Sequence, residues 1–91
     1  MDERELKLDG NAVGGLLSEI FTVEMTAATT TCAACGAVEP VGALSVYVHA
    51  PGTVVRCAHC EAVLIRIVRG NGHYWLELTG VRCLELREQH M

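Results

Sequence analysis

Two pairs of cysteines constrain this chain more than any other feature. They are Cys32-Ala-Ala-Cys35 and Cys57-Ala-His-Cys60, and 21 residues separate them. Two residues between cysteines let a tight turn aim both sulfurs at one point, and an intervening hairpin can bring two such turns together. We therefore predict one four-sulfur metal site rather than two disulfides or a redox-active dithiol. Its ligands are Cys32, Cys35, Cys57 and Cys60.

The size of the chain makes such a site useful for folding. The 91 residues allow one small domain, and although 51% are hydrophobic, only four are aromatic. A core of this size is marginal by aliphatic packing alone. Structural zinc sites contribute apparent binding free energies of ~10–16 kcal/mol. We therefore expect the metal-free chain to be unfolded or molten.

One short amphipathic helix is expected over residues 9–21. Its apolar positions recur at spacings of three and four, and they are Val13, Leu16, Leu17, Ile20 and Phe21. We predict that this stripe docks on a sheet, with a dimer interface as the alternative. Gly14 and Gly15 weaken a helix by ~1 kcal/mol each, so either they permit close packing or the helix begins late.

The remainder of the chain has the pattern of short strands. Strands are expected over residues 22–26, 43–49, 53–56, 62–69, 73–79 and 81–86. Turns are expected at Pro51-Gly52 and at Gly70-Asn71-Gly72. The predicted fold is a small α+β domain, mainly antiparallel β, over residues 9–86, between a flexible N-terminus (1–8) and a flexible tail (87–91).

An all-thiolate tetrahedral shell suits zinc or iron, and we expect structural zinc, with iron as the alternative. Such a shell leaves no open position for water or substrate, which argues against metal-based hydrolysis. Gly36 directly follows the first cysteine pair and gives its turn a permissive backbone. Glu61 occupies the equivalent place after the second pair, so that turn is less ideal.

The paired motifs resemble the zinc ribbon superfamily. Three longer runs, LDGNAVGGLLSEIF (8–21), APGTVVRCAHC (50–60) and WLELTGVRCLEL (75–86), together with CAAC, look like a family of short uncharacterised actinobacterial proteins. The resemblance spans nearly the whole chain. It implies a zinc-ribbon-like fold. It also implies partner proteins that resemble ferredoxin reductases and molybdopterin oxidoreductases.

The charge is distributed unevenly. Residues 1–30 carry six acids and two bases, whereas residues 31–91 carry five acids and five arginines. A neutral body with an acidic arm is a poor partner for a phosphate backbone. The sequence shows neither a signal peptide nor an apolar run of the ~20 residues that a spanning helix needs. We therefore expect a cytoplasmic protein with no membrane partner.

Three residues other than the four paired cysteines need an interpretation. Cys83 is predicted to be a small buried hydrophobe, with a fifth ligand, a reactive thiol or an intermolecular bridge as the alternatives. His59 is expected beside the metal site rather than among its ligands. Trp75 is predicted to be buried beneath the helix; the alternative is an exposed anchor for a partner protein, flanked by Arg66 or Arg82.

These features favour a non-enzymatic structural-zinc module that binds another protein, either as a homodimer or as an accessory subunit. No motif of a nucleophile with its base or of paired carboxylates is recognisable. Two alternatives remain. One is a rubredoxin-like iron electron carrier that partners an oxidoreductase. The other is a nucleic-acid or ribosome-associated zinc ribbon, which rests on fold analogy and four arginines, Arg56, Arg66, Arg69 and Arg82.

Overall fold

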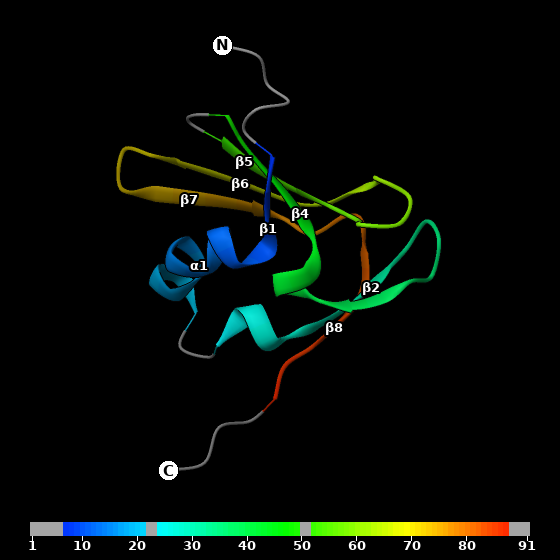
Figure 1. Ribbon diagram of the computed structural model, residues 1–91. Helices are drawn as coiled ribbons and strands as arrows, with labels where there is room; N and C mark the ends of the chain where they lie inside the picture. Colours follow the sequence, from blue (N-terminus) through cyan, green and yellow to red (C-terminus); the bar gives the residue numbers. More distant parts are fainter. Residues whose placement is uncertain (1–6, 22–23, 50–51, 88–91) are drawn as a thin grey trace.

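The computed structural model describes residues 7–21, 24–49 and 52–87. These residues form two antiparallel sheets and one short α-helix, which lies below the larger sheet in the view of Figure 1. The predicted class, a small α+β fold built mainly of antiparallel strands, is confirmed.

The larger sheet has the strand order β1-β4-β5-β6-β7, and every neighbouring pair is antiparallel. Its strands are β1 (Lys7–Asp9), β4 (Ser45–His49), β5 (Gly52–Arg56), β6 (Val63–Gly70) and β7 (His73–Glu77). The β4–β5 hairpin that was expected between the two cysteine pairs is present. Lys7 and Leu8, which the sequence assigned to the flexible start, instead pair with β4.

The smaller sheet has the order β3-β2-β8. Its strands are β2 (Thr29–Cys32), β3 (Val38–Pro40) and β8 (Val81–Glu85). The chain enters this sheet twice, because β8 returns from the far end of the sequence to pair with β2. Cys83 on β8 lies opposite Thr31 and is exposed, so the prediction of a buried thiol was wrong.

The helix α1 (Gly14–Ile20) is shorter than predicted and begins late, after the 3₁₀ turn η2 (Gly10–Val13). The Asp9 carboxylate accepts a hydrogen bond from the N–H of Asn11 and so caps that turn. The apolar stripe of the helix faces inward: Val13 and Leu17 are buried, and Leu16, Ile20 and Phe21 pack against the core. The stripe therefore packs against the core of this chain, as predicted.

The strand predicted over residues 22–26 is absent from the described part of that range. Residues 22 and 23 lie outside the described residues, and Met25–Ala27 form the 3₁₀ turn η3. The Glu24 carboxylate accepts hydrogen bonds from both the N–H and the hydroxyl of Thr26. This cap lowers the pKa of Glu24, with the Thr26 hydroxyl as the larger cause, and it turns the chain so that Met25 is buried. A further 3₁₀ turn, η4 (Val41–Ala43), precedes β4.

One continuous core joins the two sheets and the helix. Its most deeply buried aliphatic side chains are Val41, Val46, Val55, Leu64 and Ile67. Cys32 and Cys57 belong to the same core, each about 1% exposed. The metal-binding candidates are therefore continuous with the hydrophobic packing.

The β6–β7 hairpin decides where the aromatic residues point. Its two-residue turn, Asn71 and Gly72, has positive φ at both positions, as predicted for this segment. The Tyr74 hydroxyl donates to the Glu19 carboxylate on α1 at 3.0 Å, so Tyr74 faces the helix. Because successive side chains alternate, Trp75 faces away from α1, and it is 53% exposed. The prediction of a Trp75 buried beneath the helix was wrong.

Candidate metal centre

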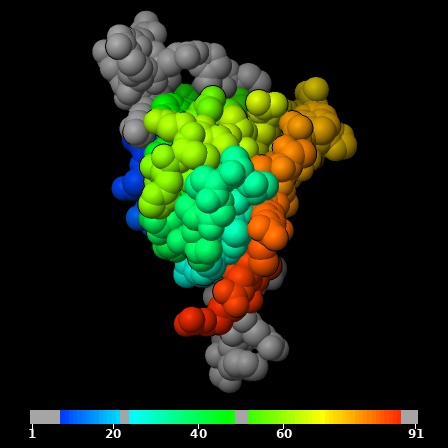
Figure 2. All heavy atoms as spheres, turned by 90° about the vertical axis from the view of Figure 1, so that its right-hand side faces the viewer, coloured from blue at the N-terminus to red at the C-terminus, as the bar shows by residue number. Residues whose placement is uncertain are grey.

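Each cysteine pair lies in the connection of one antiparallel hairpin. We call residues 32–37, between β2 and β3, the first knuckle and residues 57–62, between β5 and β6, the second knuckle. The first knuckle belongs to the smaller sheet and the second to the larger. Both lie at the right-hand end of the molecule in Figure 1, and Figure 2 views them face on.

The two knuckles have the same backbone hydrogen bonds. In the first, the N–H of Cys32 donates to the carbonyl of Ala37, and the N–H of Gly36 donates back to the carbonyl of Cys32, each at 2.9 Å. The second knuckle repeats this pattern: Cys57 donates to Ala62 at 2.9 Å, and Glu61 donates to Cys57 at 3.0 Å. Two segments of different sequence thus fold into the same sulfur-presenting loop.

The residue after each second cysteine is left-handed, with φ of +78° at Gly36 and +66° at Glu61. Glutamate adopts this conformation at a cost that glycine avoids. The surroundings hold Glu61 there: its carbonyl accepts from the Arg56 guanidinium at 2.9 Å and its carboxylate from the Tyr47 hydroxyl at 3.3 Å. The Arg56 guanidinium also lies 5.7 Å from the centre of the Tyr47 ring.

The four sulfur atoms converge. The Sγ atoms of Cys32 and Cys60 lie 3.7 Å apart, as do those of Cys35 and Cys57. All four lie within 4.8 Å of one another, and all are free thiols. A disulfide needs about 2.05 Å between sulfurs. A tetrahedral zinc with Zn–S bonds of about 2.3 Å places its sulfurs about 3.8 Å apart. The four cysteines are therefore positioned to bind a metal ion.

Electrostatics at the site favour a cation. The backbone N–H of Cys35 is the largest influence that lowers the pKa of Cys32, from 9.0 to about 7. The Ala37 N–H favours the thiolate of Cys35 in the same way, but desolvation and the three neighbouring sulfurs outweigh it and raise the pKa to about 12. The pKa of Cys60 is also raised, despite the Ala62 N–H. Four thiolates cannot share this space uncompensated, and a divalent metal supplies the missing charge.

Burial divides the four sulfurs into two kinds. Cys32 and Cys57, the first cysteine of each knuckle, are buried, whereas Cys35 and Cys60 are exposed. The N–H of His59 also donates to the Cys57 sulfur at 3.3 Å. One side of the site is thus sealed by the core, and the other faces solvent.

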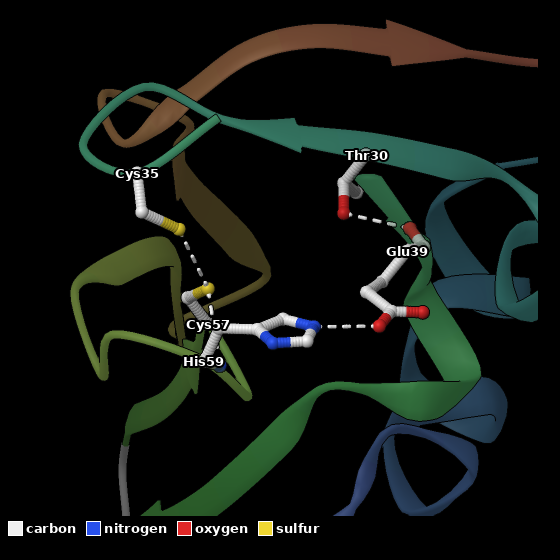
Figure 3. A network of polar contacts seen from close by, with 5 residues as sticks. All are labelled: Thr30, Cys35, Glu39, Cys57 and His59. Carbon is white, nitrogen blue, oxygen red and sulfur yellow. Dashed lines mark hydrogen bonds and ion pairs between the residues drawn. The ribbon is translucent and has the colours of Figure 1, made fainter. Parts of the chain in front are cut away.

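A polar network outside the four sulfurs connects the knuckles (Figure 3). His59 Nε2 lies 2.7 Å from a carboxylate oxygen of Glu39 on β3, and the Glu39 carbonyl accepts from the buried Thr30 hydroxyl at 2.9 Å. His59 therefore lies beside the site and points away from it, as expected. Sequence reasoning did not identify Glu39, because an acidic residue on a short strand gives no sign that it faces a histidine 20 residues away.

The model of a family of unknown function (DUF6510) matches residues 2–89. No curated protein and no solved structure matches the chain. Among the described residues, no helix has the length and apolar character needed to span a bilayer.

Proposed function

This chain belongs to that family of unknown function, DUF6510, and we propose that it is a non-enzymatic structural-zinc module that acts by binding another protein chain. The observation that carries the proposal is the convergence of four cysteine sulfurs within 4.8 Å. A shell of four thiolates is closed, so the ion stabilises the fold and has no position left to activate water.

The position of the site supports a structural role. Two sulfurs come from the smaller sheet and two from the larger, so one ion would join both sheets. The two buried sulfurs are continuous with the hydrophobic core. A metal held there contributes its binding free energy directly to folding.

The arginines give little support to a nucleic-acid function. Two of the four arginines face carboxylates: Arg66 lies 3.8 Å from Glu77, and Arg69 lies 3.3 Å from Glu19. Arg56 donates to the backbone carbonyl of Glu61 and lies over the Tyr47 ring. Cations engaged within the same chain add less to binding of a phosphate backbone than free ones. Protein binding therefore remains the favoured role.

The proposal is tested by metal analysis of the full chain from cells grown with both zinc and iron. We expect one zinc ion per chain and a colourless protein. Cobalt substitution should give the visible bands of a tetrahedral thiolate site. Red protein with stoichiometric iron would overturn the zinc assignment in favour of a rubredoxin-like electron carrier.

A matched pair of variants connects the metal to the fold. Cys32→Ser should abolish stoichiometric metal binding and cooperative unfolding, because it removes one of the four ligands. Cys83→Ser makes the same chemical change on the neighbouring strand, at an exposed residue outside the sulfur cluster. It should leave both metal content and unfolding unchanged. Equal loss of metal in the two variants would contradict the assigned ligand set.

A further inference from the structure

Strand β7 is an edge strand with few of the features that protect exposed edges. Among the described residues it pairs only with β6, and the register between them is regular from Arg66–Glu77 to Gly70–His73. Natural edges are protected by shortness, proline, lysine or bulges. β7 has five residues, His73-Tyr74-Trp75-Leu76-Glu77, with neither proline nor lysine and with uncharged large side chains in its centre.

The other three edges differ. β1 and β3 are three residues long, and each carries charged or proline residues, Lys7 and Asp9 on β1 and Glu39 and Pro40 on β3. The last edge, β8, faces β2 across an irregular register. Antiparallel pairing of β8 with a copy of itself would put Val81 opposite Glu85, which offers no favourable polar contact. β7 is therefore the edge best suited to accept a further strand.

The sequence of β7 is complementary to itself. In an antiparallel pair of two β7 strands centred on Trp75, the residue numbers that face each other are 73 with 77, 74 with 76, and 75 with 75. His73 then lies opposite Glu77 of the second copy at both ends. A shift by two residues leaves part of the strand unpaired and places Trp75 opposite His73 or Glu77.

The backbone of β7 fits the same register. In a two-residue hairpin the flanking residues, here Gly70 and His73, form a hydrogen-bonded pair, and such pairs alternate along the ladder. The N–H and C=O groups of residues 73, 75 and 77 therefore point to β6. Those of Tyr74 and Leu76 point to the free edge. In the register centred on Trp75, these outward groups face each other, which gives two hydrogen-bonded pairs, one on each side of the axis.

Trp75 would lie on the two-fold axis. A central pair without backbone hydrogen bonds brings its side chains closest together, so the two indole rings could pack on the face opposite α1. There Trp75 is 53% exposed, with the His73 ring 5.8 Å away. Exposed tryptophan at the centre of a self-complementary patch is typical of an interface anchor.

We infer that β7 is a homodimer interface, through which two copies join their larger sheets into one continuous antiparallel sheet. The inference deepens the proposed function, on which it rests for the role of protein binding, by naming a second copy of this chain as the partner. The β6–β7 turn lies at the end of the molecule away from both knuckles (Figure 1).

The experiment is sedimentation of the full, metal-loaded chain at concentrations from about 1 µM to about 1 mM, the range of weak interfaces. We expect a monomer–dimer equilibrium. Because Trp75 is the only tryptophan, its emission should shift to shorter wavelength with the same midpoint. A monomer throughout this range, or a dimer whose tryptophan emission does not change, overturns the inference.

Two substitutions to lysine test the position of the interface. Trp75→Lys places two cations directly opposite each other and should weaken the dimer at least about tenfold. Val38→Lys makes a similar change on β3, at a residue that is 60% exposed, and should leave the dimer unchanged. A Trp75→Lys protein that dimerises like the wild type contradicts the inference.

The register has its own test. His73→Glu should weaken self-association by placing carboxylates opposite Glu77, and Glu77→Lys should weaken it by placing lysine opposite His73. An equimolar mixture of the two variants restores complementary charges at both ends, so dimers should reappear. Failure of the mixture to dimerise excludes this register, since a folding defect in either variant is detected separately by its metal content.

The two proposals fail in different ways. A wild-type chain that binds metal but stays monomeric overturns only the inference of a dimer, whereas a chain that folds without metal overturns the proposed function.

Discussion

His59 Nε2 lies 2.7 Å from the carboxylate of Glu39, a contact that connects the second knuckle to the strand leaving the first. Both side chains are partly exposed, at 54% and 32%. Contacts of this kind contribute about 0.2–1 kcal/mol. The pair therefore adjusts how the two knuckles sit against each other, while the four sulfurs supply the larger stabilisation.

The first prediction concerns this pair. His59→Ala and Glu39→Ala should each lower the free energy of unfolding of the metal-loaded protein by about 0.5–1 kcal/mol, and the double variant should show coupling. Metal content should stay at one ion per chain in all three, because neither residue is a ligand. Glu39→Gln, which keeps a hydrogen-bonding group, serves as the control. Loss of the ion in His59→Ala would make histidine a ligand and contradict the four-cysteine set.

The second prediction compares the left-handed residues of the two knuckles. No neighbour lies within 4 Å of a Cβ built on Gly36, so Gly36→Ala has only a conformational cost. It should lower stability by about 1–2 kcal/mol. Glu61→Gly should raise stability by about 0.5–1 kcal/mol, since glycine adopts positive φ freely and the Arg56 contact to the backbone carbonyl remains, which outweighs loss of the exposed 3.3 Å bond from Tyr47. Denaturant unfolding at a fixed concentration of free metal measures both changes. Two changes in the free energy of unfolding that have the same sign would contradict the prediction.

The third prediction uses two other glycines. A Cβ on Gly15, in α1, would meet no neighbour within 4 Å, so Gly15→Ala should stabilise the protein by about 0.5–1 kcal/mol through helix propensity. A Cβ on Gly80 would lie 1.9 Å from the carbonyl oxygen of Val63, so Gly80→Ala should destabilise it by about 2–3 kcal/mol. Thermal unfolding of both metal-loaded variants provides the measurement. An unchanged midpoint for Gly80→Ala would contradict the prediction, because it would mean that the backbone around Val63 moves aside at little cost.

The fourth prediction concerns pH. The hydrogen bond from Tyr74 to the Glu19 carboxylate, with desolvation, raises the pKa of Tyr74 above 10.0. A raised pKa means that the contribution of this bond to stability is present below pH 10 and is lost as pH rises through the folded-state pKa. Titration of phenolate absorbance should therefore show a late-ionising tyrosine. In Glu19→Ala, which removes the acceptor, this tyrosine should ionise earlier, and Tyr74→Phe identifies the signal. A titration unaffected by Glu19→Ala would mean that the bond is absent in solution.

The features predicted correctly from the sequence are those that depend on local chemistry. Closely spaced cysteines and the Asn71-Gly72 turn specify their own geometry over a few residues. The pairing of β1 with β4 and of β8 with β2 depends on distant segments and has no local sign. The alternation along residues 73–79 predicts that Trp75 and its two neighbours lie on opposite faces of the sheet. The bond from Tyr74 to Glu19 shows which of the two faces meets the helix.

Two of the wrong predictions have separate causes. Residues 24–26 have strand-like composition, yet the Glu24 side chain caps the N–H of Thr26 and closes a turn. A short side-chain hydrogen bond thus overrides β propensity. Cys83 alternates with apolar residues, but it lies on an edge strand that nothing in the described structure covers.

The division of the four sulfurs between two sheets has a consequence for synthesis. A nascent chain that ends before residue 57 contains only two of the four donors, however long the ribosome pauses there. The site can close only after Cys60 has left the exit tunnel, and β6, β7 and β8 follow it. Final folding of this domain therefore waits until the second knuckle and the strands after it have been synthesised, and it depends on metal being available at that point.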